Sequence, residues 1–184
     1  MISHCKTGSE RSSYIKLLRK YMPVDVYGSC GEMGKRNSTE YNSLFGKYKF
    51  YLAFENNFLK EYLTEKFFNT VDYDVVAVTR GGANYSDLGI KPEWHIDTQD
   101  FSSPKELAQY LLRLDKNDTL YAQHLLWKNY YQIPPGWSWT TNLLCTLCSK
   151  VHNTSEPIKW YTKQQLIQNF YEPWCQKPND LPDH

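Results

Sequence analysis

Residues 48–57 read Tyr-Lys-Phe-Tyr-Leu-Ala-Phe-Glu-Asn-Asn, and a second polar motif, Thr-Glu-Lys, follows at 64–66. The segment 50–54 is aromatic and apolar throughout, which predicts a buried strand. Asn56 and Asn57 are typical of the turn that ends it. A polar cluster is therefore expected where an apolar strand gives way to the next element.

The next element is expected to be a helix, because apolar residues recur at helical spacing at Leu63, Phe67 and Val71. Tyr62, Glu65 and Lys66 stand at i, i+3 and i+4 and would share the opposite face of that helix. A phenol, an acid and a base then point the same way, at the end of a buried strand. This arrangement indicates a nucleotide-sugar site.

The rest of the chain alternates between strands and helices, which favours a parallel sheet covered on both faces. The expected strands are 24–27, 50–54 and 74–78, and the expected helices are 12–21, one running through 68, 103–114, 120–130, 142–151 and 164–170. Ser103, Pro104 and Glu106 form the N-terminal signature of the helix at 103–114. Ligands of such sheets bind beyond the carboxyl ends of the strands, where Asn56 and the Gly81-Gly82 pair are expected.

The motif Tyr-Lys-Phe-Tyr-Leu-Ala-Phe-Glu-Asn, with the following Tyr-x-Thr-Glu-Lys, resembles the signature of the α1,3-fucosyltransferases of glycosyltransferase family ten. These are inverting enzymes that move fucose from GDP-fucose to N-acetylglucosamine. Weaker similarity covers 3–5, 24–31, 81–85, 95–101 and 103–108. The sequence of these segments is most similar to invertebrate and plant members that fucosylate the N-glycan core. The resemblance implies an α/β fold, namely the Rossmann-like C-terminal half of a GT-B glycosyltransferase.

The resemblance also implies which side chains bind the sugar donor. The leaving GDP develops negative charge, so cations aimed at its phosphates are needed, and Lys66 and Arg36 are the candidates. Glu65 is expected to accept hydrogen bonds from the ribose hydroxyls, and Tyr62 to stack or hydrogen-bond. Asn56 has donors and an acceptor for nucleotide or fucose.

Tyr48 and Glu55 also lie in the motif. Tyr48 is placed among the donor-binding residues, with strand-edge packing as its alternative, and Glu55 is expected to brace the loop. The other candidates have plain structural alternatives as well: a solvated helix lysine, a loop arginine, an exposed helix acid and a turn residue. The family has a Val-Pro-Val-Val strand before its glycine loop, whereas this chain reads Val-Ala-Val-Thr-Arg at 76–80. Arg80 is expected to add a cation beside the proposed phosphates.

No catalytic residue is predicted in this chain. An inverting transfer needs a general base for the acceptor hydroxyl, and the resemblance implies that this base belongs to an acceptor-side domain absent from the chain. Asp97 and Asp100 resemble an acidic pair that lies near the substrate cleft in the family. The alternative is that they cap the region of the helix that begins at Ser103. No cofactor or metal is expected, because the family uses cationic side chains where other transferases use a metal.

Length and composition allow one compact domain: 184 residues, of which 41% are hydrophobic and 16% aromatic. The net charge of +1 argues against a nucleic-acid surface. We expect a donor-binding domain at 1–155 and a C-terminal extension at 156–184. No stretch is long and apolar enough to span a membrane. The resemblance implies a Golgi-lumen enzyme with an N-terminal membrane anchor, so the chain is interpreted as a fragment or a truncated gene model.

Two features are consistent with the secretory pathway. Four N-glycosylation sequons begin at Asn37, Asn84, Asn117 and Asn153. There are also five cysteines. Cys5 and Cys30 each follow an expected strand, so either they form a disulfide or they are two buried thiols.

Cys145 and Cys148 form a Cys-x-x-Cys motif without a second ligand pair, which argues against zinc. The family has a similar motif, so these cysteines are expected to form a disulfide, either with each other or with the acceptor domain. Cys175 makes the count odd, so at least one cysteine is free or paired outside the chain.

Three interpretations of function stay open. The first is a fucosyltransferase donor domain that binds GDP-fucose and, with its acceptor domain, modifies a glycoprotein glycan. The second is a nucleotide-sugar-binding module or pseudoenzyme that binds the same ligand without transfer. The third is a degenerate interaction protein with no GDP affinity, which the retained Glu65 and Lys66 disfavour.

Overall fold

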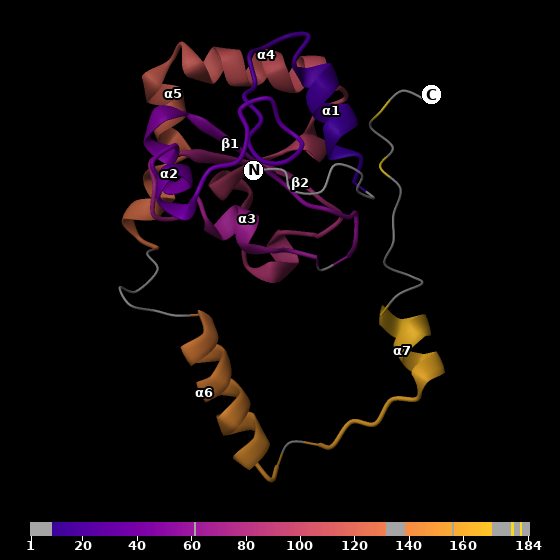
Figure 1. The fold of residues 1–184 in the computed structure, drawn as a ribbon. Helices are drawn as coiled ribbons and strands as arrows, with labels where there is room; N and C mark the ends of the chain where they lie inside the picture. The colour runs from indigo at the N-terminus through magenta and orange to yellow at the C-terminus, as the bar shows by residue number, and fades with distance from the viewer. Residues whose placement is uncertain are drawn as a thin grey trace.

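The structure is a computed structural model that describes residues 9–60, 62–131, 139–155, 157–170, 178 and 181. Its centre is a parallel sheet of three strands in chain order: β1 (Phe50–Phe54), β2 (Val76–Arg80) and β3 (His95–Asp97). All three strands run the same way, so their carboxyl ends meet at one edge of the sheet (Figure 1).

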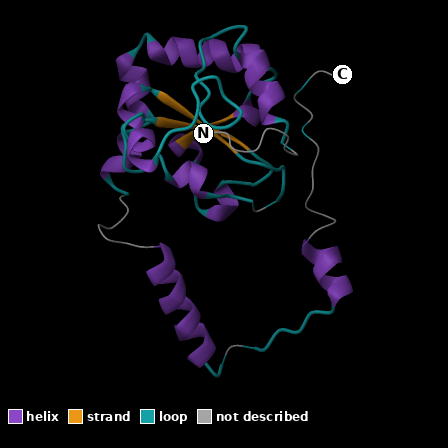
Figure 2. Ribbon diagram, in the orientation of Figure 1, coloured by secondary structure: helices purple, strands orange, loops and turns teal. Residues whose placement is uncertain are grey.

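Helices lie around the strands (Figure 2). They are α1 (Arg11–Leu18), α2 (Ser38–Asn42), α3 (Glu65–Phe68), α4 (Pro104–Asp115) and α5 (Asp118–Gln123). The described part of the chain also contains α6 (Trp139–His152) and α7 (Lys163–Phe170). Short 3₁₀ turns lie at Phe45–Lys47, Ser86–Leu88, Pro92–Trp94, Thr98–Asp100 and Leu126–Asn129.

One face of the sheet packs against α1 and α4. Side chains that alternate along the strands, Phe54, Val76, Val78 and Ile96, form a single buried cluster with Tyr14, Ile15 and Leu18 of α1 and Leu107, Ala108, Leu111 and Leu114 of α4. The Tyr14 ring meets the Phe54 ring edge-on, with centroids 5.6 Å apart. Helix α1 is thereby fixed over the carboxyl end of β1.

The opposite face carries a smaller, aromatic cluster. Ala53 and Ala77 point to this side because side chains alternate along a strand. Their small size leaves room for Phe67 of α3, which stacks on Trp127 with centroids 6.3 Å apart. The sheet is therefore covered on both sides, and the predicted α/β class is confirmed.

The expected strand 50–54 is β1, residue for residue, and the expected strand 74–78 is β2 displaced by two residues. The strand expected at 24–27 is wrong, because that segment is irregular. Its backbone instead closes a local turn, in which Met33 N donates to Val26 O and Gly28 N donates to Gly34 O.

Three predicted helices are shorter than expected. The helix expected at 12–21 is α1, which ends at Leu18. The helix through 68 begins only at Glu65, because Thr64 is extended and Tyr62 N already closes a turn on Leu59 O. The helix at 120–130 is divided into α5 and a 3₁₀ turn at Leu126–Asn129. The helix after Ser103 is confirmed as α4, with Ser103 Oγ accepting from Glu106 N at 3.3 Å.

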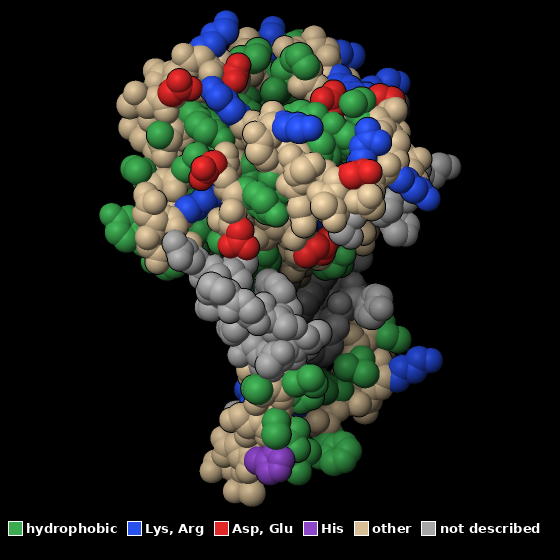
Figure 3. Space-filling view, turned by 60° about the vertical axis from the view of Figure 1, so that its left-hand side comes forward, with side chains coloured by type: hydrophobic (Ala, Val, Ile, Leu, Met, Phe, Trp, Pro, Cys, Tyr) green, Lys and Arg blue, Asp and Glu red, His purple; other side chains and the backbone are tan. Residues whose placement is uncertain are grey.

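Helices α6 and α7 confirm the helices expected at 142–151 and 164–170, and several of their large apolar side chains are exposed, including Leu144, Val151 and Leu166. On the face of the molecule drawn in Figure 3, Lys and Arg side chains alternate with Asp and Glu and form no single-sign patch. None of the helices in the described ranges is long and apolar enough to cross a membrane.

The four sequon asparagines are exposed. Each side-chain oxygen accepts a hydrogen bond from a backbone N–H two or three residues later. Each amide nitrogen is therefore turned away from the bonded backbone, and glycosylation stays a prediction.

The cysteine predictions have mixed outcomes. Cys145 and Cys148 on α6 are exposed free thiols, so the local disulfide is wrong in this structure and pairing with another domain stays a prediction. Cys30 is not a free thiol, but Cys5 lies outside the described residues, so their pairing is not tested.

Candidate functional site

Glu55 organises the polar cluster at the carboxyl end of β1. It is only 1% exposed, although it carries a carboxylate. Its Oε1 accepts from Thr64 N at 2.8 Å, and its Oε2 accepts from Thr64 Oγ1 at 2.8 Å and from Lys66 Nζ at 2.9 Å. These bonds satisfy the buried charge and close the loop between β1 and α3.

Lys66 is held by three oxygens. Its Nζ donates to Glu55 Oε2 at 2.9 Å, to Thr64 Oγ1 at 2.7 Å and to Glu65 Oε1 at 3.3 Å. An ammonium has three hydrogens, so this set uses its full capacity. The Glu65 contact is the longest, and the Glu65 side chain is 67% exposed, whereas that of Lys66 is 14% exposed. Glu65 is therefore the partner that an incoming anion can replace at least cost.

Glu65 carries a charge that its surroundings favour. Partial burial raises the pKa of its carboxyl, but the charge of Lys66 and hydrogen bonds from Thr64, Lys66 and its own backbone outweigh that effect, so the pKa is lowered. Glu65 is therefore an ionised acceptor at the rim of the cluster.

Asn56 contacts a buried arginine. Arg11, the first residue of α1, is 3% exposed, and its Nη1 donates to Asn56 Oδ1 at 2.6 Å and to Phe54 O at 3.3 Å. A guanidinium has donors only, so the side-chain oxygen of Asn56 must face it. The amide nitrogen of Asn56, which is half-buried, then points away from Arg11.

The loop after β2 packs closely on the loop after β1. A Cβ added at Gly82 would lie 2.8 Å from the backbone N of Leu59, and one at Gly81 would lie 3.3 Å from Cγ of Glu55. Gln99 supports this loop from the far side, since its Nε2 donates to Gly81 O at 2.8 Å. The two glycines bring the ends of β1 and β2 together, as expected for a ligand site at this edge.

A buried polar group lies beneath the glycines. Thr79 Oγ1 and His95 Nδ1 are 2.8 Å apart, and the His95 ring lies 4.5 Å from the Tyr85 ring. Burial lowers the pKa of His95 to about 4, so the imidazole is neutral at pH 7, and burial raises the pKa of the Tyr85 phenol. This group stays uncharged and supports the site without adding to its field.

The structure brings together four of the six predicted residues. Asn56, Glu65 and Lys66 surround the end of β1, and Tyr62 lies in the half-buried turn just before Thr64. Tyr62 precedes the helix, so the prediction that Tyr62 shares a helix face with Glu65 and Lys66 is wrong. It reaches the same region through the turn that the Glu55–Thr64 bonds close.

Tyr48 and Arg36 belong to another part of the molecule. Tyr48 precedes β1, whereas Asn56 follows it, and eight residues of extended chain span roughly 26 Å. Tyr48 Oη donates to Asp25 Oδ2 at 2.6 Å and lies 2.8 Å from Tyr27 Oη. Burial, and then hydrogen bonds to these two residues, raise the pKa of Tyr48. The Arg36 guanidinium lies 5.7 Å from the Tyr27 ring centroid.

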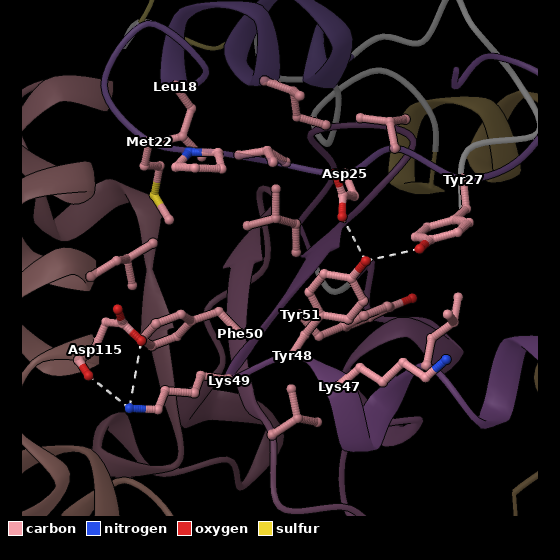
Figure 4. Close-up of a pocket in the computed structure, with 18 of the residues that line it drawn as sticks. Leu18, Met22, Asp25, Tyr27, Lys47, Tyr48, Lys49, Phe50, Tyr51 and Asp115 are labelled. Carbon is pink, nitrogen blue, oxygen red and sulfur yellow. Dashed lines mark hydrogen bonds and ion pairs between the residues drawn. The ribbon is translucent and has the colours of Figure 1, made fainter. Parts of the chain in front are cut away.

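A cavity of about 560 Å³ lies beside Tyr48. Figure 4 shows Tyr48 between Asp25 and Tyr27 on one side of it, and Lys49 with Asp115 on the other. Its walls are mainly apolar side chains from α1, α4 and the amino-terminal part of β1, such as Leu18, Phe50 and Leu111. This cavity and the clustered charges are therefore at different ends of β1.

Arg80 and Asp97 have contacts that refine their predicted roles. Arg80 is fully buried, with its guanidinium 4.3 Å from the Tyr14 ring and 4.9 Å from the Phe58 ring, and its role beside the phosphates stays a prediction. Asp97 caps the 3₁₀ turn that follows β3, where its Oδ1 accepts from Gln99 N at 3.0 Å. Asp100 is exposed.

Sequence reasoning missed Arg11 and gave Glu55 only a bracing role. Glu55 lies inside the motif and eleven residues from Lys66, so a buried acid beside a lysine was a usable signal. Arg11 lies 45 residues from Asn56, and nothing in its own neighbourhood indicates the contact.

A parallel α/β sheet with charged and amide groups at the carboxyl ends of its strands is the architecture of a nucleotide-binding domain. Residues 1–168 match the family model described as glycosyltransferase family 10 (fucosyltransferase), C-terminal. The chain therefore belongs to the family-10 fucosyltransferases, as the sequence predicted.

Curated relatives agree with this family. The chain is 37% identical to glycoprotein 3-alpha-L-fucosyltransferase A of Drosophila melanogaster over 168 residues, which is 88% of this chain and 32% of the relative. It is also 37% identical to GDP-fucose protein O-fucosyltransferase 3 of Xenopus laevis, over 68% of this chain and 29% of the relative. The chain thus spans about a third of the length of these relatives.

Solved structures confirm the fold. A crystal structure of an α1,3-fucosyltransferase with GDP-fucose superimposes with a TM-score of 0.63, at 20% identity, over 86% of this chain and 48% of that chain. A second, with GDP, gives a TM-score of 0.62 over 84% of this chain and 46% of that chain. The chain has the fold of about half of each.

Proposed function

We propose that the chain is the GDP-fucose-binding half of an inverting fucosyltransferase that transfers fucose in α1,3 linkage to N-acetylglucosamine of glycoprotein N-glycans in the Golgi lumen. The observation that carries the proposal is the Glu55–Thr64–Lys66 network at the end of β1. It lies in the part of the chain that matches the fucosyltransferase family.

The diphosphate is proposed to bind at Lys66. A phosphate oxygen replaces Glu65 as the third acceptor of the ammonium, while Glu55 and Thr64 keep the other two hydrogens and fix the nitrogen. Because Glu55 offsets much of the charge of Lys66, binding strength depends on geometry more than on net charge. A charge held in place before the leaving group departs is the effective way to stabilise it.

The same exchange makes Glu65 available. Once Lys66 turns to the phosphate, the ionised carboxylate of Glu65 is an acceptor for the two ribose hydroxyls. Tyr62 is in the turn beside it and presents a ring for the guanine. The general base for the acceptor hydroxyl comes from the acceptor-side domain, and no residue of this chain is assigned that role.

The names of the relatives support the reaction and its substrates. The name of the Drosophila relative, glycoprotein 3-alpha-L-fucosyltransferase A, supports a glycoprotein as the acceptor. The similar α1,3-fucosyltransferase structure with GDP-fucose supports GDP-fucose as the sugar donor. The alternative is a binding module without transfer, favoured by the observation that the described chain offers cations and amides for a nucleotide but no assigned base.

Calorimetric titration of the 184-residue chain with GDP, GDP-fucose and UDP tests the proposal. We expect both guanine ligands to bind at least about tenfold more tightly than UDP. We expect Lys66→Ala to lose most of that affinity, and Lys60→Ala, an exposed lysine of the same loop, to keep it. A folded chain that binds none of the three contradicts the proposal. Binding without fucose transfer by the full-length protein favours the module.

A further inference from the structure

We infer that Arg11 is a positioning residue for the sugar-donor site: it fixes the amide of Asn56 so that Asn56 presents its two N–H donors to the bound ligand. This inference rests on the proposed function and deepens it. The ligand chemistry that it selects is an acceptor oxygen, either of the diphosphate or of a sugar hydroxyl.

The orientation of Asn56 follows from donor and acceptor counting. Arg11 Nη1 lies 2.6 Å from Asn56 Oδ1, and arginine carries no acceptor, so the nitrogen of the amide cannot occupy that place. The guanidinium is buried and also donates to Phe54 O at 3.3 Å, which ties its position to the last residue of β1. The amide is therefore held in one of its two flip states.

The backbone around Asn56 is clamped by the same segment. Ser9 N donates to Asn56 O at 3.0 Å, and Ser9 Oγ donates to Glu55 O at 2.5 Å. Ser9 and Arg11 thus bind the main chain and the side chain of the strand exit together. With both fixed, the Asn56 amide has little freedom to rotate toward a ligand that needs an acceptor.

The surrounding charges fit a ligand rich in acceptors. Asn56 follows Glu55, whose carboxylate is already satisfied by Thr64 and Lys66 and faces the loop. Two amide hydrogens and the Lys66 ammonium then border the same strand end. Oxygen atoms of a nucleotide sugar match these groups, whereas a ligand that offers only donors does not.

The first test replaces the amide without disturbing Arg11. Asn56→Asp keeps an oxygen for the guanidinium and removes both donors, and Asn57→Asp places the same charge on the exposed neighbour as a matched control. We expect Asn56→Asp to raise the Kd for GDP-fucose by about tenfold or more and Asn57→Asp by no more than about threefold. Equal effects of the two variants overturn the inference.

The ligand atom is distinguished by the same titrations. If the donors of Asn56 reach a phosphate, the Kd values for GDP and GDP-fucose rise together in Asn56→Asp. If they reach the fucose, only the Kd for GDP-fucose rises. Either pattern supports the inference, because both require a donor at Asn56.

The second test asks whether Arg11 acts through Asn56. Arg11→Lys keeps a cation but loses the fork, and we expect it to weaken GDP-fucose binding about fivefold in the native background. In an Asn56→Ala background the same change should leave the Kd within about twofold, a coupling that a merely structural role does not produce. Arg19→Lys, at the residue that caps the C-terminus of the same helix and donates to Val24 O, is the control and should bind normally in both backgrounds.

Equal losses on Arg11→Lys in the two backgrounds overturn the inference. If Arg11→Lys fails to fold, as judged by circular dichroism, Arg11→Gln, which still offers N–H donors to Asn56 Oδ1, takes its place in both backgrounds. A native chain that binds neither GDP nor GDP-fucose ends the proposed function and this inference with it. If the native chain binds and neither Asn56→Asp nor Arg11→Lys changes the Kd for GDP-fucose, the inference is wrong but the proposed function stands.

Discussion

The buried charge pair between Glu55 and Lys66 makes a quantitative prediction for stability. Glu55→Gln preserves shape but turns one oxygen that faces Lys66 Nζ into a donor. Breaking a buried ion pair typically costs about 3–5 kcal/mol. Here Lys66 keeps 14% exposure and its contact with Glu65, so we expect a smaller loss of roughly 2 kcal/mol in the free energy of unfolding.

The assay is urea and thermal unfolding of single and double variants, followed by circular dichroism. A loss of about 2 kcal/mol lowers the Tm of a chain of this size by roughly 4–8 °C. Lys66→Met leaves Glu55 buried with only the Thr64 donors, and we expect a similar loss. The double variant removes both charges, so the coupling energy should reach about 2 kcal/mol.

Glu65→Gln is the matched control, because it makes the same substitution on the other acid that contacts Lys66. Its side chain is 67% exposed, so we expect a change below about 0.5 kcal/mol. The reasoning is refuted if the two single losses add within about 0.5 kcal/mol in the double variant, or if Glu55→Gln is no worse than Glu65→Gln.

The remaining predictions concern the support of the site. Gly82→Ala places a Cβ 2.8 Å from the Leu59 backbone N, so it should lower stability by more than about 2 kcal/mol and weaken GDP binding. Gly46→Ala, with open space around the added Cβ, is the control and should be nearly neutral. A neutral Gly82→Ala contradicts the close approach of the two loops. Burial lowers the pKa of His95 to about 4 from 6.5, so between pH 6.5 and 4 the imidazole is protonated in the unfolded chain but neutral in the folded one. The free energy of unfolding should therefore fall by up to about 3 kcal/mol as the pH drops from 6.5 to 4. Urea midpoints at pH 7 and 4.5 measure this loss, and His95→Gln should make the slope shallower; an unchanged slope rejects the assignment. Lys128 Nζ donates to the carbonyls of Thr70, Tyr73 and Val75 at 2.5–2.7 Å, so Lys128→Met should cost roughly 1–3 kcal/mol by thermal unfolding, and exposed Lys20→Met should cost little. Equal Tm values for the two lysine variants would show that these carbonyls do not need Lys128.

Local patterns in the sequence predicted the elements that local physics controls. Strand β1 was readable because 50–54 is a continuous apolar run ended by asparagines, and α4 because Ser103, Pro104 and Glu106 mark its start. Glu65 and Lys66 were identified through a motif whose members lie close together in the chain.

Predictions that depended on distant contacts fared less well. Val24–Tyr27 has strand-forming residues, but its hydrogen bonds go to its own loop at Met33 and Gly34. Tyr62 has the spacing for the helix face, yet the Glu55–Thr64 bonds start the helix three residues later. Arg11 and Asn56 meet only because α1 packs over β1, and no pattern in either segment reports that contact. Arg36 and Tyr48 stay predictions as sugar-donor contacts, since their described contacts are around Tyr27.

The location of the nucleotide is the central claim, and amide chemical-shift mapping tests it most directly. The ¹⁵N-labelled chain is titrated with GDP, and backbone signals are followed at both ends of β1. We expect the largest shifts at 55–57, 62–66 and 81–84, with small shifts at 24–27 and 44–52 around the 560 Å³ cavity. Shifts confined to the residues around that cavity would contradict the account, because the nucleotide would then bind at the opposite end of the strand from Lys66.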